Sequence, residues 1–350
     1  MTDFRPEVNL ITLRNPTPAR YNKMHNSLRK RFNAHLITGT LVPTIHLNMN
    51  IGTVFSYVNL FSKSLYNNKK TIVDINALSS ARLQIGPDLI VDFRTPLAYE
   101  LNWLGHGLLS SIARTNEQTL KKVGMVIAAN ERMVQYCSSL GAEYIIEIPN
   151  YPTADFKPTV EASKWKTKNR ISNRIALFTG GVRLREIYGL DLLLESWRIV
   201  EKSLTDVSLV ILGDESIDYI QSKCRSLNLK NVVLPGIVNR KGVANWINCA
   251  DLCLAPRTPG FSDFFYNFKD STKISEYAAL KKPIVATCYA PSSQYLLVEA
   301  SPDTFAEGIF KGLDGKVNPA IAHFWEENEP CLLNAIESFW FKKRIPIICK

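Results

Sequence analysis

The residues best suited to chemistry lie in one stretch, DSTKISEYAALKKPIVAT, which spans residues 270–287. Ser271 or Thr272 can cap a helix, apolar residues then recur at helical spacing, and Pro283 ends the pattern before a short apolar strand. The first N–H groups of a helix lack intrahelical acceptors and carry partial positive charge. This helix start is therefore suited to binding a phosphate.

Glu276 lies one turn into the predicted helix, where its carboxylate can accept hydrogen bonds from sugar hydroxyls. A capping box needs an acid three residues after the cap, and neither Ser271 nor Thr272 has one at that spacing. Two interpretations stay open: Glu276 contacts a ligand, or it only offsets the helix dipole.

A second candidate loop, FTGGVRLR, covers residues 178–185. Paired glycines after a strand let the backbone approach a ligand closely, and Arg183 and Arg185 can pair with a diphosphate. The spacing is neither that of a Walker loop nor that of a dinucleotide fingerprint. Taken alone, glycines after a strand usually just form a turn.

Both loops belong to a chain in which short apolar strands alternate with helices of 10 to 15 residues. The predicted strands are 8–13, 35–38, 71–75, 88–92, 124–129, 144–148, 174–178, 207–212, 231–234, 251–255 and 284–287. The predicted helices include 96–114, 130–140, 189–202, 217–227, 242–249 and 272–282. This alternation predicts an α/β protein with two doubly wound parallel sheets, whose ligands bind at the carboxyl ends of the strands in the cleft between the halves.

The length of 350 residues fits two domains. We expect an N-terminal Rossmann-like domain over 1–155, a linker over 156–172 and a second Rossmann-like domain over 173–317. The aromatic-rich tail, 318–350, is expected to form a helix that packs back on the first domain.

Composition is that of a soluble globular protein, with 46% hydrophobic and 21% charged residues. No apolar run reaches the roughly 18 residues that span a bilayer, and the N-terminus lacks the apolar core of a signal peptide, so we expect a cytoplasmic protein. Cysteines and histidines are dispersed, and no metal site is expected.

The net charge of +10 is unevenly distributed, because no acidic residue occurs between Glu7 and Asp74. A probable helix over residues 19–32 carries Arg20, Lys23 and Arg31 beside apolar residues. Such a helix predicts contact with an anionic membrane surface, although a solvated basic face explains it too. No nucleic-acid-binding motif accompanies the charge, and no nucleic-acid partner is expected.

In their order and spacing, the motifs of the second half resemble family 4 glycosyltransferases of the GT-B fold. The matching segments are 179–183, 189–194, 210–213, 233–236, 250–256 and 271–287. In the first half, 126–131 and 148–150 resemble the segment before the interdomain linker, and 92–96 resembles an acidic-basic turn of the cleft.

The resemblance implies that the second domain, 173–317, is the nucleotide-sugar-binding domain and that the first, 1–155, is the acceptor-side domain. Glu276 matches the second glutamate of the family's E-x7-E motif, which holds the ribose, and Arg183 matches the arginine on the donor diphosphate. The other donor-binding residues implied are Gly180, Gly181, Arg185, Asp270, Ser271 and Thr272.

Two departures from the family pattern concern the donor site. Phe268 occupies the position of the first glutamate, so either Asp270 or Asp263 substitutes for it or the sugar hydroxyls are held differently. Tyr188 occupies the position of a lysine, for which Arg185 is a candidate replacement.

We therefore expect a hexosyltransferase of polysaccharide or glycolipid biosynthesis, peripheral on the inner face of the membrane. It would move sugar from a nucleotide-diphosphate sugar to a glycan or lipid-linked acceptor, with retention and without a metal or other cofactor. Leaving-group charge would be stabilised by Arg183, Lys273 and the helix start. Asp92 is the candidate for orienting the acceptor, and its alternative role is to cap the turn after a strand.

Three other classes stay open. A GT-B-type nucleotide-sugar epimerase would share the fold. A catalytically degenerate sugar-nucleotide-binding protein would fit Phe268 and Tyr188. A nucleic-acid-binding protein would explain the charge but not the ordered motifs.

Overall fold

The computed structural model describes residues 5–12, 19–38, 70–78, 85–103, 105–180, 188–213, 217–259 and 271–342. The chain forms two compact units. Unit 1 comprises Met1–Asn150 with Trp325–Lys350, and unit 2 comprises Tyr151–Phe324.

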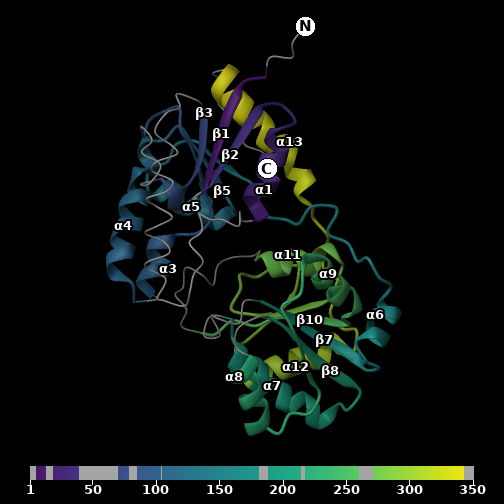
Figure 1. Ribbon diagram of the computed structural model, residues 1–350. Coiled ribbons are helices and arrows are strands. Elements are labelled where there is room, and N and C mark those ends of the chain that lie inside the picture. The colour runs from purple at the N-terminus through teal and green to yellow at the C-terminus, as the bar shows by residue number, and fades with distance from the viewer. Residues whose placement is uncertain are drawn as a thin grey trace. The chain divides into compact units, whose positions relative to one another are not determined.

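Unit 1 is built on a six-stranded parallel sheet in the order β2-β1-β3-β4-β5-β6 (Figure 1). The strands are β1 (Glu7–Thr12), β2 (Asn33–Thr38), β3 (Lys70–Asp74), β4 (Ile90–Phe93), β5 (Met125–Ala128) and β6 (Ile145–Glu147). Its helices are α1 (Ala19–Leu28), α3 (Leu97–Trp103), α4 (Gly107–Gln118), α5 (Glu131–Ser139) and α13 (Trp325–Glu337), with short turns η1 (Ile75–Ala77), η2 (Thr119–Lys122) and η4 (Ser338–Lys342). Apolar residues of α1 and α13 share one buried cluster with strand residues such as Leu10 and Ile72.

Unit 2 holds a second parallel sheet, in the order β12-β11-β10-β7-β8-β9. The strands are β7 (Arg174–Thr179), β8 (Val207–Leu212), β9 (Val232–Gly236), β10 (Leu252–Ala255), β11 (Ile284–Thr287) and β12 (Leu296–Val298). The helices are α6 (Ala162–Lys168), α7 (Leu190–Ser203), α8 (Ile217–Ser226), α9 (Arg240–Cys249), α11 (Thr272–Ala279) and α12 (Pro302–Leu313).

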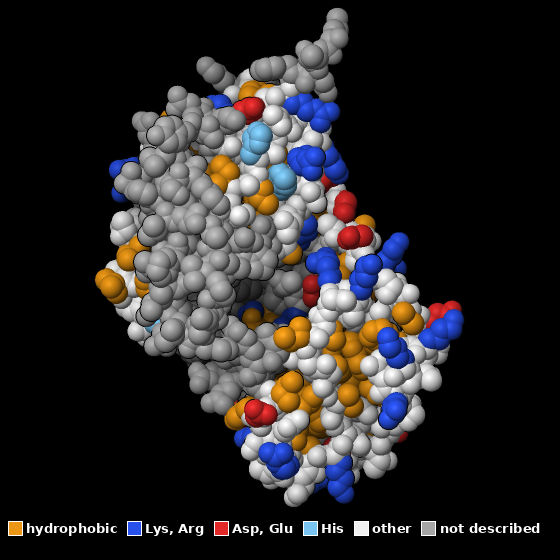
Figure 2. Space-filling model, in the orientation of Figure 1, with side chains coloured by type: hydrophobic (Ala, Val, Ile, Leu, Met, Phe, Trp, Pro, Cys, Tyr) orange, Lys and Arg blue, Asp and Glu red, His pale blue; other side chains and the backbone are white. Residues whose placement is uncertain are grey.

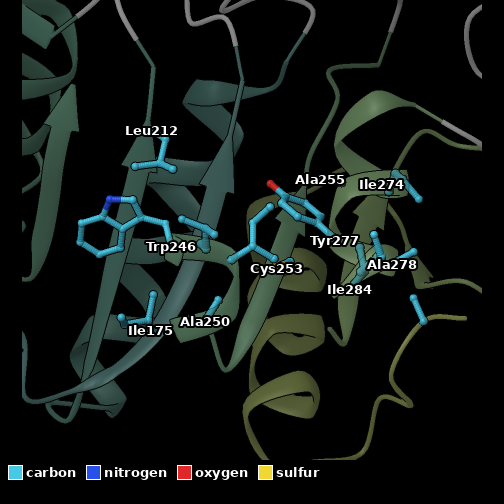
Figure 3. Close-up of a cluster of buried hydrophobic side chains, with 14 of the residues drawn as sticks. Ile175, Leu212, Trp246, Ala250, Cys253, Ala255, Ile274, Tyr277, Ala278 and Ile284 are labelled. Atoms are coloured by element: carbon cyan, nitrogen blue, oxygen red, sulfur yellow. The ribbon is translucent and has the colours of Figure 1, made fainter. Parts of the chain in front are cut away.

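Alternate residues of β7 serve two cores, as expected for a strand covered on both faces. Ile175 and Leu177 join the cluster under α9 and α11, which Figure 3 shows in close-up. Ala176 and Phe178 join the cluster under α7 and α12. The predicted fold class, α/β with two doubly wound Rossmann-like sheets, is confirmed.

Each sheet has a point at which the strand order reverses. In unit 1 this point lies between β1 and β3, and in unit 2 it lies between β7 and β10. Ligands of open parallel sheets bind outside the carboxyl ends of the strands at such points. Thr179, which ends β7, Gly180, which follows it, and Arg257, which follows β10, therefore lie at the expected ligand position of unit 2.

Three expected segments differ in the structure. The helix predicted over 96–114 is two helices, because Gly105 between them has a left-handed φ of +79°. The predicted linker over 156–172 contains α6, whose Trp165 packs edge-to-face on Trp246 at 6.0 Å and so ties it to unit 2.

The expected tail also begins elsewhere. Residues from 318 to Phe324 stay with unit 2, where Ala320 N–H donates to the Lys282 carbonyl at 3.1 Å. The helix that joins unit 1 begins at Trp325, whose indole N–H donates to the Ser27 hydroxyl at 2.9 Å.

Candidate functional site

The start of α11 is formed as its sequence predicts. Ser271 is the N-cap, and its hydroxyl accepts the N–H of Ile274 at 3.4 Å. The same hydroxyl lies 3.3 Å from the Tyr289 hydroxyl, which orients it. Thr272 and Lys273 form the first turn, so their N–H groups have no intrahelical acceptor.

Lys273 turns from this first turn into the protein and is only 7% exposed. Its ammonium lies 4.1 Å from the centre of the Phe178 ring and 4.4 Å from that of Tyr188. A Cβ built on Gly180 would lie 3.0 Å from the Lys273 Nζ. The end of β7 and the start of α11 therefore meet at this ammonium.

Among the residues that the structure describes, the Lys273 Nζ has no hydrogen-bond partner. Aromatic faces stabilise a cation, but they do not neutralise it. Burial lowers the pKa of Lys273 well below its ordinary value, Arg257 adds to the shift, and Glu276 opposes it. A buried cation with no hydrogen-bond partner in the described part of the chain is suited to an anionic ligand.

Arg257 is the functional candidate that the sequence analysis missed. It follows β10 and is 8% exposed, and its guanidinium lies 3.9 Å from the centre of the Tyr289 ring. Thr287 fixes its backbone, because the Thr287 hydroxyl accepts the Arg257 N–H at 2.8 Å and donates to the Arg257 carbonyl at 2.9 Å. Its place just beyond a strand at the reversal point of the sheet was the available signal.

Gly189 holds α7 close to this arginine. It is the N-cap of α7 in a left-handed conformation, with φ of +59°. A Cβ at this position would lie 3.1 Å from backbone atoms of Arg257. Both facts require glycine here.

Glu276, the expected ribose-binding residue, lies on α11 next to Lys273 and is half-buried. Glu276 and Lys273 are three residues apart on α11, so they occupy neighbouring positions on the surface of the helix. Among the predicted donor residues, the structure brings together Gly180, Ser271, Thr272, Lys273 and Glu276. The remaining predicted residues, Gly181, Arg183, Arg185 and Asp270, lie outside the described residues, as do Asp263 and Phe268.

Asp92, the candidate for orienting the acceptor, is fully buried in β4. Arg20 donates to it from Nε at 3.0 Å and from Nη2 at 2.8 Å, and the Tyr21 hydroxyl donates at 2.7 Å. Burial and the carboxylates of Asp74 and Asp92 raise the pKa of Tyr21, so the phenol remains a donor. These hydrogen bonds occupy the Asp92 carboxylate inside unit 1. A carboxylate held in this way does not fit a contact with an acceptor.

The basic helix over 19–32 also differs from the expectation. Arg20 and Lys23 point into unit 1, where the Lys23 ammonium donates to Asn150 Oδ1 at 2.8 Å. Arg31 and Lys30 pair with Glu337 and Glu329 of α13. The charges of this helix therefore hold unit 1 together, which does not fit a basic face turned toward a membrane.

Among the described residues, no helix is both long and apolar enough to cross a bilayer. The same residues contain no group of three metal-binding side chains. Figure 2 shows Lys and Arg side chains scattered over the visible face of unit 2 rather than gathered in one patch.

Comparison with protein-family models finds a match within unit 2. Residues 173–314 match a family model described as Glycosyl transferases group 1. No curated protein matches the sequence.

Solved structures resemble the chain over nearly its whole length. The sucrose-phosphate synthase of Thermosynechococcus elongatus has a TM-score of 0.70 at 12% identity, with 97% of each chain covered. A protein described as a UDP-N-acetylglucosamine 2-epimerase from Listeria monocytogenes has a TM-score of 0.67 at 13% identity, covering 99% of this chain and 100% of its own. Anabaena HepE with UDP-glucose has a TM-score of 0.65 at 13% identity, covering 96% and 97%.

At 12% to 13% sequence identity, these structures show only that the fold is shared. The family match covers residues 173–314, which make up most of unit 2. The chain thus has the GT-B fold, and its second unit matches the Glycosyl transferases group 1 family.

Proposed function

We propose that this chain is a family 4 glycosyltransferase that moves a hexose-type sugar from a nucleotide-diphosphate sugar to a glycan or lipid-linked acceptor. The reaction would retain configuration and use no metal ion. The observation that carries the proposal is the buried Lys273 ammonium, which has no hydrogen-bond partner among the described residues and lies beside Gly180 at the start of α11.

The donor's diphosphate is the ligand that best suits this ammonium. Departure of a nucleotide diphosphate concentrates negative charge on its phosphate oxygens, and fixed donors aimed at that charge lower the barrier. Lys273 and the first N–H groups of α11 supply such donors, and Arg257 adds positive charge nearby.

The other roles complete the proposal. Glu276 would accept the ribose hydroxyls, and Gly180 with Gly181 would let the backbone approach the donor. Arg183 and Arg185 would pair with the phosphates, with Asp270 near the sugar. We assign Asp92 no contact with the acceptor, because Arg20 and Tyr21 occupy its carboxylate. The reaction would take place in the cytoplasm, with the acceptor delivered from a glycan or a membrane lipid.

Nucleotide binding tests the proposal directly. Isothermal titration with UDP and GDP should give saturable binding to one of them, and Lys273→Met should weaken it at least tenfold. Lys282→Met is a matched control on the segment that follows α11, because the Lys282 ammonium donates to the Asn248 carbonyl at 2.8 Å. Binding of neither nucleotide, or equal loss in both variants, would overturn the proposal.

Measuring the turnover of UDP- and GDP-sugars distinguishes a glycosyltransferase from an epimerase and from a protein that only binds the sugar nucleotide. Nucleotide release that requires an acceptor supports transfer. Interconversion of the sugar without an acceptor supports an epimerase, the activity named for the Listeria monocytogenes protein of the same fold. Binding without turnover of UDP- or GDP-sugars supports a degenerate binding protein.

A further inference from the structure

The hydroxyl of Tyr277 joins three elements of unit 2. Tyr277 lies one turn beyond Lys273 on α11 and is fully buried. Its oxygen accepts the backbone N–H of Thr179 at 2.8 Å and the Thr179 hydroxyl at 3.0 Å, and it donates to the Leu254 carbonyl at 3.3 Å. One phenol therefore ties α11 to the ends of β7 and β10, with its full hydrogen-bonding capacity in use.

These bonds lie where β7 and β10 separate. The β7–β10 register ends with the pair Phe178 and Leu254. Beyond this pair, β7 stays paired with β8 through Thr179, and β10 stays paired with β11 through Ala255. The separation is the reversal point of the sheet, where ligands of such folds bind.

The two partners are next to donor-site residues in the chain. Thr179 immediately precedes Gly180, and Tyr277 immediately follows Glu276. The Thr179–Tyr277 hydrogen bonds thus link the backbone beside the glycine loop to the helix that carries Lys273. The Tyr277 ring packs separately, in the cluster with Cys253 and Ile274 (Figure 3).

We propose that the Tyr277 hydroxyl is a positioning group for the donor site: it holds the start of α11 and Gly180 at the separation that lets both contact the same diphosphate. The inference rests on the proposed function and adds a residue that touches no substrate. Ring packing holds the helix on the sheet, and the hydroxyl fixes where along β7 the helix start lies. Without the hydroxyl, the buried N–H and carbonyl groups at the strand ends lose a partner, so this end of the sheet rearranges.

Tyr277→Phe tests the proposal because it keeps the ring and removes the hydroxyl. Titration calorimetry with UDP or GDP, whichever the wild type binds, should show affinity at least tenfold weaker. On this proposal the displaced groups contact the second phosphate, so affinity for the corresponding nucleoside monophosphate should fall less than threefold. A general loss of packing would weaken both nucleotides alike.

Tyr295→Phe is the matched control. Tyr295 is also buried in unit 2, and its hydroxyl donates to the Ala290 carbonyl. Both variants lose a buried phenol hydroxyl, but Tyr295→Phe should change diphosphate affinity less than twofold. Thr179→Val, which removes only the Thr179 hydroxyl, should weaken diphosphate binding about threefold. It replaces Tyr277→Phe as the test variant if Tyr277→Phe does not fold.

The outcomes separate this inference from the proposed function. If the wild type binds a nucleoside diphosphate and both Tyr277→Phe and Thr179→Val bind it equally well, the positioning role is wrong and the proposed function stands. If the wild type binds neither UDP nor GDP, the proposed function fails and the positioning role fails with it.

Discussion

The ammonium of Lys273 lies 4.4 Å from the centre of the Tyr188 ring. The resemblance to family 4 glycosyltransferases calls for a lysine at position 188, immediately before Gly189. In this chain a cation from α11 lies beside the aromatic ring that replaces that lysine. The departure at Tyr188 therefore does not remove positive charge from the end of β7.

Glu276→Ala should weaken donor binding at least tenfold, about 1.4 kcal/mol. The reason is that its carboxylate is the proposed acceptor for the ribose hydroxyls. Titration with UDP or GDP measures the change. Glu307→Ala on α12, where Glu307 pairs with Lys311 at the surface, is the control and should bind normally. Unchanged affinity in Glu276→Ala would remove this residue from the site.

Gly189→Ala should lower both stability and donor affinity. Alanine at the left-handed φ of +59° costs about 1 to 2 kcal/mol, and its Cβ would press on the Arg257 backbone at 3.1 Å. Gly315→Ala is matched in strain, with φ of +73°, but its Cβ would meet nothing within 4 Å. Thermal unfolding and nucleotide titration should show a larger loss for Gly189→Ala. Equal stability losses with intact binding in both would show that the Arg257 contact is unimportant.

Asp92→Asn should destabilise unit 1 by about 3 to 5 kcal/mol, because it leaves the buried Arg20 guanidinium without its counter-charge. Asp88→Asn breaks an exposed pair with Lys70 and should cost no more than about 1 kcal/mol. Denaturant unfolding gives both values. A stable Asp92→Asn that binds donor normally but transfers no sugar would restore Asp92 as a group that acts on the acceptor.

Much of this architecture could be predicted from the sequence because local patterns determine it. The apolar strands, the Ser271 cap and the position of α11 follow from periodicity and capping, and the structure has all three. The break at Gly105 was missed, because a single left-handed glycine interrupts an otherwise continuous helical pattern.

Other features of the sites depend on contacts between residues far apart in the sequence. Arg20 and Asp92 are 72 residues apart in sequence, so no local sequence pattern predicts their ion pair. The same holds for Arg257, whose importance depends on which strands are neighbours in the sheet. Charge along a sequence predicted a basic surface at α1, whereas tertiary packing buries two of those charges.

Titration of Lys273 should make the free energy of unfolding rise with pH and the affinity for a nucleoside diphosphate fall with pH. Because its pKa is lowered in the folded state, the unfolded chain binds more protons between the two pKa values, and the free energy of unfolding rises with pH in that window. A bound diphosphate raises the lysine pKa, so binding takes up a proton and affinity falls as pH rises. Titrations from neutrality to about pH 10 approach the ordinary lysine pKa of about 10.4 from below. Affinity that does not change with pH, with no proton uptake, would contradict this account.

The most direct test combines two measurements on Lys273→Met. Removing a buried charge that has no hydrogen-bond partner among the described residues should raise the free energy of unfolding by about 1 to 3 kcal/mol, while nucleoside-diphosphate affinity falls at least tenfold. A variant that is both more stable and weaker in binding is the predicted result. A variant that is less stable, or that binds UDP and GDP as the wild type does, would contradict the claim that this lysine is held for the donor's phosphates.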